Sequence, residues 1–187
     1  MDLSTDYLKL IKEKETVHKY THTLGVIDES VKLAIKYGAN KDKARIAASL
    51  HDITKNMSFD QQREMIKRVF GDEILKDITE PIYHSYSGYV YAKEELKIDD
   101  EEILNAILCH TIGKPNMSLL DKIIFIADFI EPSRDYYEAE LARKIAYKNI
   151  DEALVYIMEI NITLNEKAGK HVPKLSYEAL DYYKRRS

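Results

Sequence analysis

Five segments of the chain each place a histidine or an aspartate on a face that is otherwise apolar or built from small residues. These candidate ligands are His22, the neighbouring pair His51 and Asp52, His84, His110 and Asp128. A buried imidazole or carboxylate is costly without a partner. Imidazole and carboxylate groups without a thiolate cluster suit Fe, Mn, Zn, Co or Mg, and a shared carboxylate suits a two-metal centre. The residue types therefore indicate a metal centre without choosing its metal.

Taken one at a time, each of these residues has a simpler interpretation. A single histidine on an apolar face is more often a hydrogen-bonded core residue than a ligand. Asp128 interrupts the most hydrophobic run of the chain, residues 123–130, where it could pair with a lysine or an arginine. The metal interpretation depends on all five segments facing inward together.

The elements that must position these residues are predicted to be helices. Ala44, Ala47, Ala48 and His51 are spaced as one helical face, which favours a buried line of small residues that a second helix can approach closely. We expect the same helix to carry Lys55 and to project it toward the site. The alternative for Lys55 is a solvated lysine favoured by the helix dipole.

The remaining pattern predicts an all-α fold of about nine to ten helices around a buried metal site. Apolar residues recur every three or four positions, no convincing strand pattern appears, and the 187 residues include only six glycines and four prolines. Capping boxes at Ser58 and Ser118 predict two helix starts, and Gly38 predicts a helix end. We expect helices at about 4–15, 19–37, 44–55, 59–70, 81–96, 102–110, 119–130, 136–149, 151–167 and from 176, with a weaker one at 72–78.

Length and charge limit the class of protein. A chain of 187 residues predicts one domain spanning residues 1–187. Its 28 basic residues against 32 acidic ones lack the basic excess of a nucleic-acid binder. The single cysteine, Cys109, forbids an intrachain disulfide. No apolar run is long enough to span a membrane, and no signal peptide is visible. We therefore expect a cytoplasmic protein with no nucleic-acid or membrane partner, and a homodimer through apolar helix faces stays open.

Around the candidate ligands, five short sequence motifs, in this order along the chain, resemble those of the HD-domain metal-dependent phosphohydrolases, specifically their YqeK-type branch. The motifs are HTLGV at 22–26, LHDITK at 50–55, HSYSG at 84–88, HTIG at 110–113 and IADFIEPSR at 126–134. The resemblance covers roughly residues 17–165 and leaves 166–187 as a helical extension without a matching motif. It implies an enzyme that splits diadenosine tetraphosphate, a dinucleoside polyphosphate, symmetrically into two ADP.

The resemblance also implies roles for the six candidate ligands. His22, His51 and Asp128 would hold one divalent ion, His84 and His110 would hold a second, and Asp52 would bridge both. Iron is the expected metal, with manganese, cobalt, magnesium and zinc as alternatives.

Catalytic and substrate-binding roles are implied for a few neighbouring residues. Asp52 and Lys55 would be catalytic, and Lys55 would contact a phosphate or protonate the leaving oxygen. Arg134 would make a bidentate phosphate contact, and Thr111 would bond a phosphate or the backbone. Lys19 would also bind the substrate, but it stands where an arginine is expected just before the first ligand, and a lysine does not make the bidentate phosphate contact of an arginine.

Other activities compete with this interpretation. An HD phosphohydrolase could act on a nucleoside monophosphate or a guanosine alarmone instead. A non-catalytic nucleotide-binding module that regulates a partner, or a purely structural helical domain, would use the same elements without turnover. His18 and His171 lie in polar surroundings and are expected at the surface.

Overall fold

The computed structural model describes residues 3–14 and 16–186, which form ten α-helices and two short 3₁₀ helices and contain no β-strand. The all-α prediction is confirmed for this part of the chain. The α-helices are α1 (Leu3–Lys14), α2 (Val17–Tyr37), α3 (Lys41–Leu50), α4 (Phe59–Phe70), α5 (Tyr83–Glu94), α6 (Glu101–Cys109), α7 (Leu119–Ile130), α8 (Tyr137–Ala146), α9 (Ile150–Lys167) and α10 (Lys174–Lys184). The 3₁₀ helices η1 (Glu73–Lys76) and η2 (Glu80–Ile82) join α4 to α5.

Local signals set several of these boundaries. The predicted capping boxes form at Ser58, which accepts from the Gln61 amide, and at Ser118, which accepts from the Asp121 amide. Gly38 ends α2 in the left-handed conformation, with φ 76°. Asp100 caps α6 with its side chain, which accepts from the amides of Glu102 and Ile103.

The helix expected to carry His51, Asp52 and Lys55 ends earlier than predicted, at Leu50. Residues 51–56 form successive turns instead, in which the Lys55 amide donates to the Asp52 carbonyl at 2.9 Å. Bonds from residue i+3 to residue i wind the chain more tightly than an α-helix does. The ligand pair therefore lies just beyond the helix end, and Lys55 still lies near Asp52.

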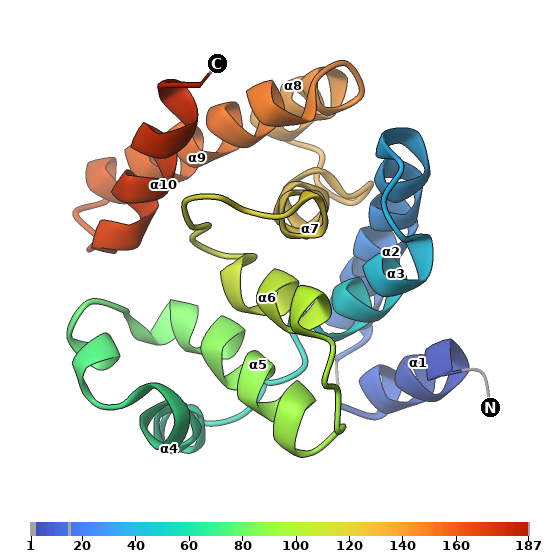
Figure 1. Ribbon diagram of the computed structural model, residues 1–187, viewed down its shortest axis with the longest axis vertical. Coiled ribbons are helices and arrows are strands. Elements are labelled where there is room, and N and C mark those ends of the chain that lie inside the picture. The colour runs from blue at the N-terminus through green and yellow to red at the C-terminus, as the bar shows by residue number, and fades with distance from the viewer. Residues whose placement is uncertain (1–2, 15, 187) are drawn as a thin grey trace.

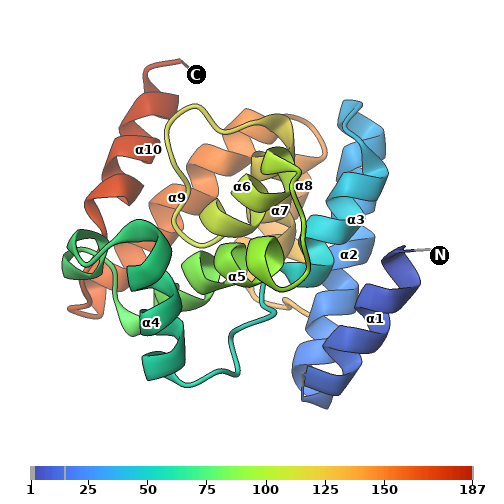
Figure 2. The same cartoon turned by 60° about the horizontal axis from the view of Figure 1, so that its bottom comes forward.

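Helix α7 lies in the middle of the arrangement (Figure 1) and packs against α2, α3, α6, α8 and α9. Helices α9 and α10 pack together at the end away from α2 and α3 in both views (Figures 1 and 2). The apolar run of residues 123–130 thus becomes the central helix, which explains why it is apolar on nearly every side.

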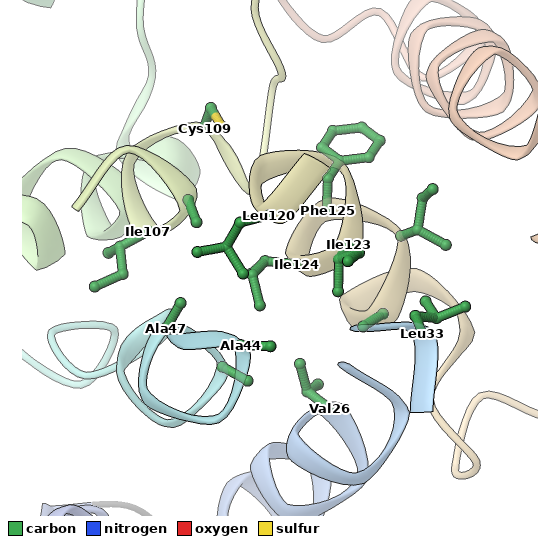
Figure 3. Packing of buried hydrophobic residues seen from close by; sticks show 14 of the residues in the cluster. Val26, Leu33, Ala44, Ala47, Ile107, Cys109, Leu120, Ile123, Ile124 and Phe125 are labelled. Atoms are coloured by element: carbon green, nitrogen blue, oxygen red, sulfur yellow. The ribbon is translucent and has the colours of Figure 1, made fainter. Parts of the chain in front are cut away.

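The core beneath the site is built from apolar side chains of four helices. Figure 3 shows Val26 from α2, Ala47 from α3, Ile107 from α6 and Ile124 from α7, each with no exposed surface. Ala44 and Ala48 are equally buried, so the predicted small-residue face of α3 is confirmed.

Gly88 allows α5 to lie close to α6, since a Cβ at this position would lie 3.2 Å from a methyl carbon of Ile107.

None of the helices in the described ranges is long and apolar enough to cross a membrane.

Candidate metal centre

The structure brings the six predicted ligands together from separate elements. They are His22 in α2, His51 and Asp52 in the turn after α3, His84 in the first turn of α5, His110 directly after α6 and Asp128 near the end of α7. Five of them are buried, and the Asp128 side chain keeps 22% of its surface exposed.

Asp52 lies at the centre of this cluster. Its Oδ1 atom is 3.2 Å from His84 Nε2 and 3.6 Å from His110 Nε2, and its Oδ2 atom is 3.7 Å from His51 Nε2. Two sets of three ligand atoms, each within 4.8 Å of one another, share Asp52: one with His22 and His51, the other with His84 and His110. This arrangement suits two ions with a common carboxylate.

Asp128 joins the cluster through the first set. Its Oδ1 atom lies 3.0 Å from His22 Nε2 and 3.9 Å from His51 Nε2. Asp128 therefore lies beside His22 and His51, the two residues with which it is expected to hold one ion.

The histidine rings are oriented by hydrogen bonds through their other nitrogen. His51 Nδ1 lies 2.7 Å from the Ala48 carbonyl, and His110 Nδ1 lies 2.7 Å from the Ile107 carbonyl. Since a carbonyl only accepts, Nδ1 must carry the proton in both rings, and a neutral ring then presents an unprotonated Nε2 to the cluster. This tautomer is the one that binds a metal through Nε2.

The cluster contains buried polar atoms that the protein does not satisfy. Within the described residues, His22 Nε2, His51 Nε2, Asp52 Oδ1 and Asp128 Oδ1 have no hydrogen-bond partner. Lone pairs that face one another in a buried site repel unless a cation lies between them. The residues present therefore fit divalent metal ions.

The electrostatics favour the protonation states that metal ligands need. Burial lowers the pKa of His51 to about 4, so its ring is neutral at pH 7. Burial alone would raise the pKa of Asp52, but the surrounding imidazoles of His51, His110 and His84 outweigh it and hold the pKa well below its ordinary value. An ionised carboxylate between neutral imidazoles is the state that binds a divalent ion.

His22 differs from His51 because two carboxylates surround it. Burial lowers the pKa of His22, but Asp128 and Glu131 outweigh this effect and raise the pKa above its ordinary value. A proton on His22 and a metal ion would therefore compete for the same space beside Asp128.

Glu131 is a site residue that the sequence analysis did not single out. It is 1% exposed, its Oε1 lies 3.0 Å from His22 Nδ1, and its Oε2 accepts from the Ser133 amide at 2.8 Å. Gly25 leaves room for it, since a Cβ there would lie 2.5 Å from Glu131 Oε2. A glutamate directly after the apolar helix was the available signal, but its partner His22 is 109 positions away.

Thr54 fixes the turn that carries His51 and Asp52. Its buried hydroxyl donates to the His84 carbonyl at 3.0 Å and lies 2.7 Å from the Ser87 hydroxyl. One ligand turn is thereby attached to the helix that carries another ligand.

The predicted phosphate-binding residues make different contacts, and two of them reach a ligand of the cluster. Lys55 Nζ donates to Asp52 Oδ2 at 2.7 Å, and Arg134 Nη2 lies 3.5 Å from Asp128 Oδ1. Thr111 is half-buried and donates to the Ser85 hydroxyl at 3.1 Å. The Lys19 ammonium binds the Asn56 side chain.

A cleft of about 670 Å³ opens from the cluster. His110, Thr111, Asp128 and Arg134 line its near end. Its remaining walls come from η2, α7, the second half of α9 and the segment between α9 and α10. This volume lies within the range of about 300–1,000 Å³ typical of small-molecule sites.

Comparison with known proteins agrees with this arrangement. Residues 20–133 match the model of the HD domain, and the chain belongs to this family. Two relatives are named "Bis(5'-nucleosyl)-tetraphosphatase, symmetrical". The one from Halalkalibacterium halodurans is 38% identical to this chain over 88% of both chains. The one from Bacillus subtilis is 36% identical over 79% of this chain and 80% of its own length.

A solved structure has the same fold over nearly its whole length. It is the crystal structure of a "predicted HD superfamily hydrolase involved in NAD metabolism" from Clostridium acetobutylicum. It has a TM-score of 0.92 and 34% identity, and the match covers 98% of this chain and 97% of that one. The family resemblance and the HD-domain fold expected from the sequence are confirmed, and the individual ligand and substrate roles stay predictions.

Proposed function

We propose that this protein is a metal-dependent hydrolase that cleaves diadenosine tetraphosphate symmetrically into two ADP. The observation that carries the proposal is the pair of ligand sets sharing Asp52, directly beside a cleft with Arg134 at the same end. The names of the two relatives support a dinucleoside tetraphosphate as the substrate and symmetrical cleavage as the reaction.

We propose that the cluster holds two divalent ions and that iron is the native metal. His22, His51 and Asp128 would hold one ion, His84 and His110 the other, and Asp52 both. Ions bound there would supply Lewis acidity, which lowers the pKa of water and neutralises phosphate charge. The ligand set alone also suits Mn, Co, Mg and Zn.

The chain's own residues would then position the tetraphosphate. Arg134 is 39% exposed, and its Nη2 lies 3.5 Å from Asp128 Oδ1, so its guanidinium would be placed to donate to a phosphate bound at the cluster. Lys55 lies against Asp52 with 38% of its side chain exposed. From there its ammonium can donate a proton or a hydrogen bond to the leaving phosphate oxygen. Thr111 would add a hydroxyl contact at the cleft, and Lys19 would add a positive charge for the phosphates.

Attack of water at either inner phosphorus, with cleavage of the central P–O–P bridge and ADP as the leaving group, gives two ADP, because two phosphates lie on each side of that bridge. The site must therefore hold the inner phosphates against Asp52, Lys55 and Arg134, with one nucleoside leading away on each side. The cleft provides one such path.

The buried, unpaired Cys109 fits a reducing compartment, and we propose that the protein works in the cytoplasm as one domain over residues 1–187. Nucleotides rather than nucleic acids or membranes are the proposed partners.

Product analysis tests the proposal. The metal-loaded protein is incubated with diadenosine tetraphosphate, a nucleoside monophosphate, a guanosine alarmone and NAD, and the products are separated by chromatography. NAD is included because the similar protein from Clostridium acetobutylicum is named as a hydrolase involved in NAD metabolism. We expect ADP as the sole product from diadenosine tetraphosphate. ATP plus AMP would contradict symmetrical cleavage, and nucleotide binding without turnover would favour a regulatory module.

A further inference from the structure

Arg143 in α8 donates its hydrogen bonds to the backbone of the segment that follows α7. Its Nε donates to the Ile130 carbonyl at 2.9 Å, and its Nη2 donates to the same carbonyl at 2.7 Å. Nη2 also lies 3.2 Å from the carbonyl oxygens of Glu131 and Arg134. A guanidinium presents its N–H donors in a fixed plane, so this one side chain can hold three carbonyls in one geometry.

The packing of α8 lets this arginine reach the end of α7. Ala139, Ala142 and Ala146 have no exposed surface, and Arg143 follows the same helical spacing of i, i+3, i+4, i+7. Helix α8 packs against α7 along this small-residue face, and Arg143 is half-buried there. A charged group in such a place needs hydrogen-bond partners, and the carbonyls supply them.

The segment that Arg143 holds is a tight turn. The Ile130 carbonyl belongs to the last residue of α7, where it has no partner within the helix. The Arg134 amide donates to the Glu131 carbonyl at 2.9 Å, with Pro132 at the second position of the turn, where proline is favoured. Arg143 contacts the carbonyls of the first and last residues of this turn, so it sets where the turn lies relative to α7.

The place of the turn decides where the Arg134 side chain lies. Arg134 Nη2 is 3.5 Å from Asp128 Oδ1, and its Nε is 3.6 Å from Glu131 Oε1. These contacts keep the guanidinium at the end of the cleft that is nearest to the ligand cluster. A long side chain loses entropy when it is held in one conformation, so a fixed backbone beneath it favours the contact.

We propose that Arg143 is a positioning residue that holds Arg134 in place for its contact with the substrate phosphates. The inference rests on the proposed function, in which Arg134 binds a phosphate. Arg143 itself does not line the cleft, so its effect on phosphate binding must pass through the turn. A displaced Arg134 would lose its bidentate contact, because two parallel N–H···O bonds require a defined direction.

Calorimetric titration of inorganic tripolyphosphate into the metal-loaded full chain tests this role. We expect Arg134→Ala to weaken binding about 10–100-fold, the effect of a lost charged hydrogen bond. Arg143→Lys should weaken it about 10-fold, because lysine keeps the charge but not the planar fork. In the Arg134→Ala background, Arg143→Lys should change the affinity less than about twofold, because the residue that it positions is absent.

Two further variants complete the test. Lys144→Ala removes an exposed charge next to Arg143 in α8 and is the matched control, with unchanged affinity expected. Arg143→Gln removes the charge but keeps one amide donor, and its loss of affinity should depend on Arg134 in the same way.

A purely structural role for Arg143 predicts a different pattern. Equal losses of affinity with and without Arg134 would overturn the proposal, as would unchanged affinity in Arg143→Lys or no tripolyphosphate binding by the unsubstituted protein. Coupling between Arg143 and Arg134 without cleavage of diadenosine tetraphosphate would support the positioning role and contradict the proposed function. Cleavage without this coupling would do the reverse.

Discussion

At the scale of single residues, the function of this site depends on which nitrogen of each histidine is free. His51 and His110 each bond a carbonyl through Nδ1, and His22 bonds the Glu131 carboxylate through Nδ1. In all three rings Nε2 is therefore directed at the cluster. Partners of this kind fix ring orientation and raise ligand basicity.

Replacing Glu131 tests this orientation. Glu131→Gln keeps the shape of the side chain but removes the charge that faces His22, so we expect metal affinity to fall about 10–100-fold. Competition with a chromogenic chelator measures the affinity. Glu140→Gln, at an exposed position in α8, is the control, and equal affinities in both variants would contradict the role of Glu131.

Lys55 is the residue to test for proton donation. We expect Lys55→Gln to lower kcat about 10²–10⁴-fold while metal content stays unchanged, because general acid catalysis contributes an effect of this size. Steady-state kinetics with elemental analysis of the same sample measures both. A loss of metal with little change in kcat per bound ion would show instead that Lys55 only pairs with Asp52.

At the scale of elements, the same hydrogen bond between a ligand histidine and a backbone carbonyl occurs at the ends of two helices. His51 follows α3 and His110 follows α6, and each bonds the carbonyl three residues earlier, in the last turn of its helix. Those carbonyls lack a partner within the helix. Each bond gives one carbonyl of the last helical turn a hydrogen-bond partner, and the same bond orients the histidine ring toward the cluster.

Packing between α2 and the end of α7 supplies the next prediction. In a free helix Gly25→Ala would stabilise by about 0.5–1 kcal/mol. Here the new Cβ would lie 2.5 Å from Glu131 Oε2, so we expect a net loss of about 1–3 kcal/mol in the free energy of unfolding. Urea denaturation measures it. Combining the change with Glu131→Ala should remove most of the loss that Gly25→Ala causes, and fully additive effects would count against this contact.

Sequence patterns predicted the helix boundaries that local caps set better than the boundary that tertiary contacts set. The caps at Ser58 and Ser118 and the buried alanine face of α3 follow from local rules and are confirmed. The helix expected to continue to Lys55 stops at Leu50, because Thr54 bonds the distant His84 carbonyl, and tertiary bonds of this kind leave no local signal.

The site shows the same division. The six candidate ligands could be recognised as inward-facing polar residues and by the sequence motifs around them, and the structure places them together. Glu131 could not be recognised, because an acidic residue at a helix end is ordinary in isolation. Its position beside His22 depends on a contact between distant segments.

At the scale of the whole molecule, the ligand cluster connects α2, α5, α7 and the ends of α3 and α6. Removing the ions would leave the buried lone pairs facing one another, so a chelator should lower Tm by roughly 5–15 °C. Scanning calorimetry with and without chelator measures the shift. The Tm of Asp52→Ala should be insensitive to chelator, and an unchanged Tm in the unsubstituted protein would contradict metal-linked stability.

The central claim is that one carboxylate, Asp52, holds both ions, and metal content per chain tests it most directly. Elemental analysis of the purified full chain and of Asp52→Ala is the measurement, with Asp42→Ala on the exposed face of α3 as the control. We expect about two ions per chain in the unsubstituted protein and the control, and a value near background in Asp52→Ala. An Asp52→Ala protein that retains one or two ions would contradict the shared ligand.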